Sequence, residues 1–262
     1  MTNVQQLRRF GRLAGRAALL LDYDGCLAPI VGDPALAVPH PDARDALRRL
    51  VPVMRRVAVI SGRPVAFLRS HLGIDGLVYS GQYGLERADG DAITIDPRVE
   101  PYIELLASLA EDARAELDDV LIEDKGGVAL ALHWRQNPDL DEPARAWARR
   151  AALEHGLALF PGRMVVELRP PLSVDKGTAV EQLCSGVRAA AFAGDDRADL
   201  ACFDALDRLE DADTLEYALR VGVVSDEAPG ELLDRSDLQV QGPEGVVAML
   251  RALADEITDE RA

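Results

Sequence analysis

The sequence predicts an α/β protein, with a core built on a parallel sheet and a smaller inserted α+β domain. Short apolar runs without alternation, such as 17–21 and 57–60, are typical of strands buried on both faces. Helical patterns separate these runs along the chain. Between 88 and 170 the strands instead alternate polar with apolar residues and come in pairs around turns, as in an antiparallel sheet with one wet face. We therefore expect a core of residues 1–87 and 171–262 and a cap domain at 88–170.

The same patterns give the expected elements. In the core we expect strands at 17–21, 57–60, 77–79, 189–193, 219–224 and 238–240, and helices at 43–50, 178–186 and 245–256. In the insert we expect helices at 101–117 and 143–155, and strands at 120–125, 128–134, 157–160 and 164–168. Residues 88–97 are expected to form a linker or a hairpin. Helix caps are expected at Asp42, Ser61 and Asp175, and Trp134 is expected in the core of the insert.

Composition restricts the partners and the compartment. The chain has 262 residues and a formal net charge of −16, with a sequence pI near 4.7, which argues against nucleic acid or anionic membranes as partners. Its three cysteines lie far apart, so neither a disulfide framework nor a zinc site is expected, and a reducing cytoplasm is favoured. The apolar run after the arginine-rich start is too short for a signal peptide, and no run approaches the length of a membrane span.

Two carboxylates follow the first strand, in the sequence Asp22-Tyr23-Asp24-Gly25. In open α/β sheets ligands bind just outside the carboxyl ends of the strands. An ionised carboxylate can attack phosphorus without a general base, and a second carboxyl group can protonate the departing alkoxide and then activate water. Mg²⁺ would offset the repulsion between nucleophile and phosphate. A lone Asp-x-Asp-Gly turn is usually only solvated, but later segments supply the other parts of a phosphoryl-transfer site.

Those segments lie at the ends of other core elements. Ser61 follows the second strand and offers a hydroxyl and free backbone N–H groups, as phosphate sites do, although an ordinary helix cap is an alternative. Lys176 begins a helix, where a cation opposes the helix dipole unless an anion binds there. Asp195, Asp196 and Asp199 follow a buried strand, and their mutual repulsion favours a bound cation. We expect Asp195, the first after the strand, to bind the metal in preference to Asp196.

The insert carries charges two residues apart, a spacing that places each pair on one face of a strand. The pairs are Glu123 with Lys125, His133 with Arg135, and Glu167 with Arg169. Carboxylates and guanidinium groups on one sheet face suit sugar hydroxyls. A solvent-facing sheet with cross-strand ion pairs is an equally good interpretation.

Four motifs in this order resemble those of the haloacid-dehalogenase (HAD) phosphatases. They are Asp22-x-Asp24-Gly25, Ser61-Gly62-Arg63, Lys176-Gly177 and Gly194-Asp195-Asp196-x-x-Asp199. The insert lies between the second and third motifs, where that superfamily places its larger cap domain. With the segments 27–30, 123–126, 133–135 and 167–170, the chain resembles the trehalose-6-phosphate phosphatases more closely. The resemblance implies a HAD-like Rossmannoid core with an α+β cap.

The resemblance also implies roles for individual residues. Asp22 would be the nucleophile and Asp24 the acid/base, with Mg²⁺ on Asp22, the backbone carbonyl of Asp24, and Asp195. Ser61 and Lys176 would bind the phosphoryl group, and Asp196 and Asp199 would support the metal and Lys176. The residues implied in substrate binding are Gly62, Arg63, Glu123, Lys125, His133, Arg135, Glu167 and Arg169.

The implied reaction is hydrolysis of trehalose 6-phosphate, a small-molecule sugar phosphate, to trehalose and phosphate through an aspartyl-phosphate. Three departures from the family pattern bear on rate and substrate: Cys26 replaces Thr, Tyr83 replaces His, and Ala198 and Leu200 replace Thr and Glu. A phosphatase for another sugar or glycosyl-glycerate phosphate, or a catalytically silent lobe that binds a sugar phosphate, are the alternatives.

Overall fold

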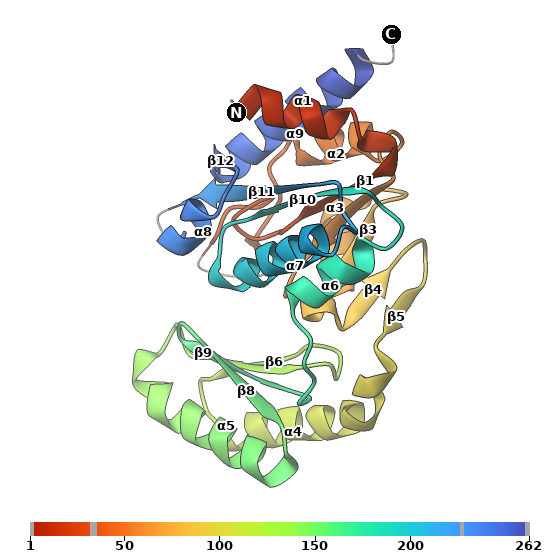
Figure 1. The fold of residues 1–262 in the computed structure, drawn as a ribbon. Coiled ribbons are helices and arrows are strands. Elements are labelled where there is room, and N and C mark those ends of the chain that lie inside the picture. Colours follow the sequence, from red (N-terminus) through yellow and green to blue (C-terminus); the bar gives the residue numbers. More distant parts are fainter. Residues whose placement is uncertain (1–2, 32–35, 226–227, 260–262) are drawn as a thin grey trace. The chain divides into compact units, whose positions relative to one another are not determined.

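The computed structural model describes residues 3–31, 36–225 and 228–259, and the chain divides into two compact units (Figure 1). One unit comprises 1–94 and 174–262, and the other comprises 95–173. The division falls a few residues beyond the expected limits of 88 and 170. The reason is that 88–97 contributes to a hairpin whose strands, β4 (Glu86–Ala88) and β5 (Ile93–Ile95), extend the sheet of the first unit.

The larger sheet has the strand order β12-β11-β10-β1-β2-β3-β4-β5, and β12 to β3 run parallel. The antiparallel strand β4 pairs with β3. The expected parallel sheet is therefore confirmed. The parallel strands are β1 (Ala17–Leu21), β2 (Arg56–Ile60), β3 (Val78–Gly81), β10 (Ala189–Gly194), β11 (Tyr217–Val224) and β12 (Leu238–Gln241).

Helices cover both faces of this sheet (Figure 1). The two faces show in β1 itself, because Leu19 and Leu21 belong to one apolar cluster and Ala18 and Leu20 to another. The first cluster includes residues of α1 (Asn3–Gly11), α2 (Ala43–Leu50), α3 (Val65–Leu72) and α9 (Gly242–Asp259). The second includes residues of α6 (Lys176–Leu183), α7 (Leu200–Asp211) and α8 (Gly230–Asp234). The sequence patterns gave no expectation for α1, α7 or α8.

The second unit is a four-stranded antiparallel sheet in the order β6-β7-β9-β8, with two helices on one face (Figure 1). Its strands are β6 (Leu121–Asp124), β7 (Leu130–His133), β8 (Ala158–Gly162) and β9 (Val165–Arg169). Leucines of β7 and β9 pack with α4 (Ile103–Glu116) and α5 (Asp141–His155) in one cluster, which also holds the buried Trp134 as expected. In the part of the chain that the structure describes, no helix is long and apolar enough to cross a membrane.

Two of the expected helix caps are wrong and one is confirmed. Asp175 caps α6 through a bond from the Thr178 N–H at 2.8 Å. Asp42 makes no cap hydrogen bond from its side chain. Ser61 does not begin a helix, because α3 starts only at Val65, where the backbone N–H donates to Glu86 of β4 at 2.7 Å. A carboxylate brought from a different strand thus takes the place of the local hydroxyl.

Glu86 makes stability depend on pH. Burial raises the pKa of Glu86, and the bond from Val65 only partly opposes this. Because the pKa of Glu86 is higher in the folded chain, the neutral carboxyl group makes its full contribution to folding stability below the ordinary Glu range. That contribution is lost as the pH rises through the folded-state pKa. Glu86→Gln keeps an acceptor but cannot ionise. We expect its unfolding free energy, relative to the unchanged chain, to rise between about pH 4 and pH 7 in urea titrations. The exposed Glu111→Gln serves as the control, and a difference independent of pH for Glu86→Gln would contradict this interpretation.

Candidate active site

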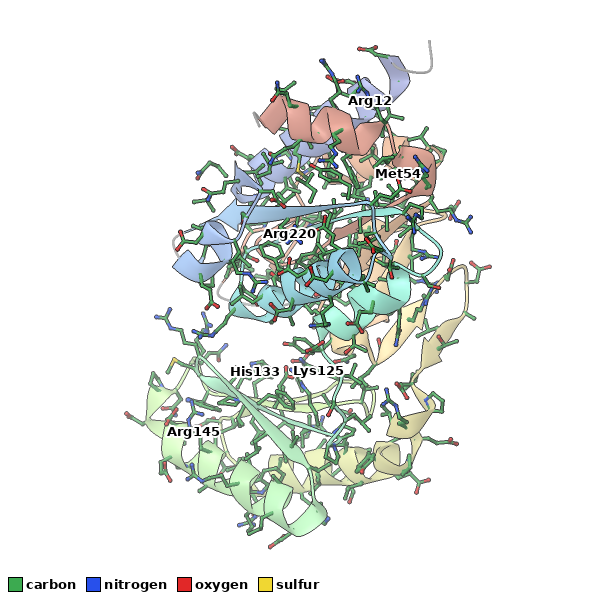
Figure 2. All side chains as sticks on the ribbon, in the orientation of Figure 1. Arg12, Met54, Lys125, His133, Arg145 and Arg220 are labelled. Carbon is green, nitrogen blue, oxygen red and sulfur yellow. The ribbon has the colours of Figure 1, made fainter. Side chains whose placement is uncertain are left out.

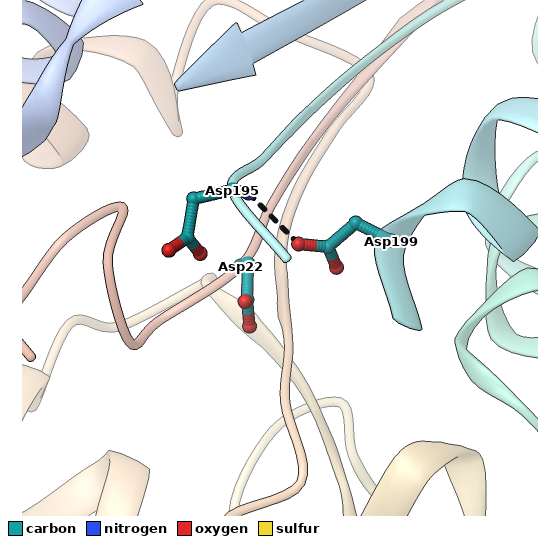
Figure 3. A group of neighbouring side chains, drawn as sticks. All are labelled: Asp22, Asp195 and Asp199. Carbon is teal, nitrogen blue, oxygen red and sulfur yellow. Dashed lines mark hydrogen bonds between the residues drawn. The ribbon is translucent and has the colours of Figure 1, made fainter. Parts of the chain in front are cut away.

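The core motifs meet at one edge of the larger sheet. Since β10, β1 and β2 are neighbours and parallel, the residues that follow them lie close together at their carboxyl ends. Figure 3 shows Asp22 after β1, Asp195 after β10, and Asp199 just before α7, with a dashed line for the bond from the Asp195 N–H to Asp199. Oxygens of these three residues lie within 4.8 Å of one another. The buried polar residues at this edge are Asp22, Ser61, Lys176, Asp195 and Asp199.

Lys176 neutralises part of this negative charge. Its ammonium group lies 2.9 Å from Asp22 Oδ2 and 2.7 Å from Asp199 Oδ1, and all three side chains are almost fully buried. Burial alone would lower the pKa of Lys176, but the charges of Asp199 and Asp22 outweigh it, so the pKa lies above its usual range. Lys176 therefore stays charged. Burial also raises the pKa of Asp22, and Lys176 is the main group that opposes this.

Asp199 organises the loop rather than facing an open site. Its Oδ2 accepts hydrogen bonds from the backbone N–H groups of Asp195 and Asp196, at 2.9 and 3.1 Å, and its Oδ1 accepts from Lys176. A Cβ on Gly194 would lie 2.4 Å from the Asp199 carboxyl group, so only glycine fits there. Asp196 accepts from the Asp199 N–H at 3.1 Å, and its side chain is about half exposed. The carboxylate of Asp199 is thus fully occupied by protein donors.

Asp195 differs, because among the described residues no donor hydrogen-bonds its carboxylate, although the residue is only 2% exposed. Burial and then the neighbouring Asp199 and Asp196 raise the pKa of Asp195 to about 7. Gly25, at φ +73°, passes so close that a Cβ would lie 2.0 Å from Asp195 Oδ2. The cluster at this edge sets one lysine against several carboxylates. A hard divalent cation on oxygen ligands, such as Mg²⁺, fits this donor set, with Asp22 and Asp195 as side-chain ligands.

Asp24 and the second motif are joined by an ion pair that the sequence did not predict. Arg63 Nε and Nη2 donate to the two carboxylate oxygens of Asp24, at 2.9 and 2.8 Å. Ser61 Oγ accepts from the Arg63 backbone N–H at 3.1 Å. A Cβ on Gly62 would lie 2.6 Å from the ring of Tyr83, so Gly62 makes room for that ring. Arg63, which the resemblance implies in substrate binding, contacts the acid/base candidate in this structure.

In the cap unit, Lys125 and His133 lie at the sheet face without helices (Figure 2). Leu132, Val166 and Leu168 face the helices, so alternation puts His133, Glu167 and Arg169 on that other face as well. Glu167 lies between Lys125 and Arg169 and is hydrogen-bonded to both, and His133 Nε2 lies 2.9 Å from Glu123. Burial would raise the pKa of Glu167, but these two cations outweigh it and the pKa is lowered. Arg135 departs from the expected arrangement, because β7 ends at His133 and Arg135 lies in the following turn.

The family assignment rests on a sequence comparison. Residues 20–232 match the family model described as trehalose-phosphatase. The chain belongs to the trehalose-phosphatase family. A trehalose-phosphate phosphatase of Mycobacterium avium is 36% identical over 208 residues, which make up 74% of this chain and 52% of the relative. An uncharacterized glycosyl hydrolase of Mycobacterium tuberculosis is 35% identical over 218 residues, 77% of this chain and 16% of the relative. The chain therefore spans about half, or less, of the length of these curated relatives.

Solved structures confirm the expected HAD-like fold. A trehalose-6-phosphate phosphatase related protein superimposes with a TM-score of 0.78 at 22% identity, over 93% of this chain and 99% of that one. A haloacid dehalogenase-like hydrolase of Bacteroides thetaiotaomicron gives a TM-score of 0.63 at 15% identity, over 89% and 98%. At these identities the likeness concerns the fold.

Mg²⁺ should stabilise this family member measurably. At about a hundredfold excess over its dissociation constant it should add about 2–3 kcal/mol to the unfolding free energy, seen as a higher melting temperature. Asp195→Asn removes an unpaired buried charge, so the metal-free variant should be more stable by about 1–3 kcal/mol and should lose most of the response to Mg²⁺.

The exposed Asp211→Asn on α7 is the matched control and should change neither quantity. An Asp195→Asn variant that responds to Mg²⁺ as the unchanged chain does would show that Asp195 is not a ligand.

Proposed function

We propose that this chain is a Mg²⁺-dependent phosphatase that hydrolyses trehalose 6-phosphate to trehalose and phosphate through an aspartyl-phosphate. The observation that carries the proposal is the buried Asp22, paired with Lys176 and next to the unpaired Asp195 at the carboxyl ends of β1 and β10. The family match and the named relatives support the substrate. No aspartate or lysine of the four motifs is missing, so a catalytically silent lobe is not favoured.

Each core residue has a place in this reaction. Asp22 attacks phosphorus in line with the bond to the sugar oxygen, and that bond breaks as the acyl phosphate forms. Asp24 gives a proton to the departing sugar oxygen, and then takes one from the water that attacks the phosphorus of the acyl phosphate. Phosphate leaves and Asp22 is restored. Lys176 and Ser61 hold the phosphoryl oxygens throughout. Bound Mg²⁺ would supply Lewis-acid neutralisation of the phosphate charge beside Asp22 and Asp195.

The cap face defined by Glu123, Lys125, His133, Glu167 and Arg169 is proposed to recognise the sugar. The core unit presents groups suited to phosphate and metal, and these do not distinguish one sugar from another. The cap groups are held in fixed positions by their mutual ion pairs, which suits directional bonds to hydroxyl groups. Reaction in a reducing cytoplasm is part of the proposal, supported by the three buried free cysteines.

A panel of phosphate esters tests this function. With Mg²⁺ present, phosphate release should be measured from trehalose 6-phosphate, a glycosyl-glycerate phosphate, glucose 6-phosphate and glycerol phosphate. We expect kcat/KM for trehalose 6-phosphate to exceed the others by about tenfold or more, because two rings can use more of the cap contacts. A higher kcat/KM for the glycosyl-glycerate phosphate or for a monosaccharide phosphate would show that trehalose 6-phosphate is the wrong substrate. Phosphate release from none of the esters would overturn the phosphatase assignment.

Glu167→Gln tests the cap. The substitution keeps the shape but removes the charge between Lys125 and Arg169, and an imperfectly paired buried group costs about 1–3 kcal/mol. We expect kcat/KM for trehalose 6-phosphate to fall about 5- to 150-fold, with p-nitrophenyl phosphate hydrolysis nearly unchanged. The exposed Glu142→Gln on α5 is the control. Equal losses on both esters would instead indicate a structural role for Glu167.

A further inference from the structure

The two-point contact between Arg63 and Asp24 restricts the orientation of the Asp24 carboxylate, the group that we propose protonates the leaving group. Nε and Nη2 of Arg63 bond to Oδ2 and Oδ1 of Asp24 at 2.9 and 2.8 Å. The side chains of both residues are partly buried, at 19% and 35% exposure. A two-point contact of this kind fixes the plane of a carboxylate, which a single ammonium contact does not. An aspartate beside a glycine turn otherwise has several staggered side-chain conformations open to it.

The position of Arg63 is fixed by hydrogen bonds to its backbone and by an aromatic ring beside its guanidinium group. Its backbone N–H donates to Ser61 Oγ, and its carbonyl accepts from the Gln82 N–H at 3.1 Å. A Cβ on Gly81 would lie 2.7 Å from that carbonyl oxygen, so the two loops touch at the backbone. The guanidinium carbon lies 4.6 Å from the centre of the Phe67 ring. The position of the guanidinium group is therefore set by the backbone, by Asp24 and by an aromatic face.

Phe67 continues this support. Its ring stacks on His71 at 4.1 Å between centroids and meets the ring of Tyr23 edge-on at 5.7 Å. Tyr23 is fully buried between the two catalytic candidates in sequence, and its hydroxyl donates to the Ala37 carbonyl at 2.8 Å. A packed group thus runs from Tyr23 through Phe67 to Arg63 and ends on the Asp24 carboxylate.

We propose that Arg63, backed by Phe67, is a positioning residue that holds the Asp24 carboxyl group in line for proton transfer to the departing sugar oxygen. This inference rests on the proposed phosphatase function and deepens it. Misplacing a catalytic group by about 1 Å can cost on the order of a hundredfold in rate. In the step that releases the alcohol or phenol, only leaving groups that need a proton depend on that placement. A sugar oxygen must be protonated as it departs, whereas p-nitrophenolate leaves as a stable anion.

The test compares these two kinds of ester with Arg63→Lys, Arg63→Gln and Phe67→Leu. The quantity is kcat/KM, because it covers only the steps up to departure of the alcohol or phenol. For the best sugar phosphate of the panel, we expect both Arg63 variants to lose about 10- to 100-fold and Phe67→Leu to lose less. For p-nitrophenyl phosphate we expect losses below about threefold. Arg63→Lys should not restore the sugar-phosphate activity that Arg63→Gln loses, because an ammonium group cannot make both contacts to Asp24.

Arg69→Gln is the matched control, since Arg69 lies on α3, the helix that carries Phe67, but bonds to the Gly90 and Asp91 carbonyls. It should leave both activities unchanged. Equal losses on the two esters, or full rescue by Arg63→Lys, would overturn the positioning role. A sugar-selective rise in KM with kcat unchanged would show that Arg63 binds substrate, as the resemblance implies. If the unchanged chain releases phosphate from neither ester, the phosphatase function fails, a result distinct from any of these.

Discussion

A single buried ammonium group supports the acidic edge of the larger sheet. Lys176 bonds to Asp22 and Asp199, while Asp195 stands close by with no donor among the described residues. One cation cannot balance these carboxylates away from water, where unpaired charges cost several kcal/mol each. The remaining negative charge makes the edge suitable for a divalent cation, and that cation would offset the repulsion between these carboxylates and a phosphate. The proposed phosphatase chemistry follows from this imbalance.

Close backbone approach makes the arrangement possible. A Cβ on Gly177 would lie 2.3 Å from the Ala201 carbonyl oxygen, so only glycine lets α6 come near enough to α7 for Lys176 to reach Asp199. Gly25 and Gly194 leave the same room beside Asp195 and Asp199. Motif glycines that look like simple turn residues in the sequence therefore act sterically, by admitting charged groups from segments far along the chain.

The sequence predicted what depends on local pattern. Buried runs located the strands, and the strand ends located Asp22 and Asp195, because parallel strands present their carboxyl ends at one edge. Contacts between segments far apart in the chain could not be predicted from the sequence. Glu86 replaces Ser61 as the helix cap, and Arg63 turns to Asp24, because the sheet order β1-β2-β3-β4 brings the ends of these strands together. Arg135 was misplaced since alternation cannot show where a strand ends.

The central claim is that Asp22 becomes phosphorylated, and trapping the phosphorylated enzyme tests it most directly. The chain would be mixed with Mg²⁺ and trehalose 6-phosphate, quenched in acid within milliseconds, digested, and its peptides weighed by mass spectrometry. Our account predicts one phosphoryl group on the peptide that contains Asp22, formed and lost during turnover and absent from Asp22→Asn. Phosphate release with that peptide unmodified at every quench time, or with the phosphoryl group on another residue, would contradict it.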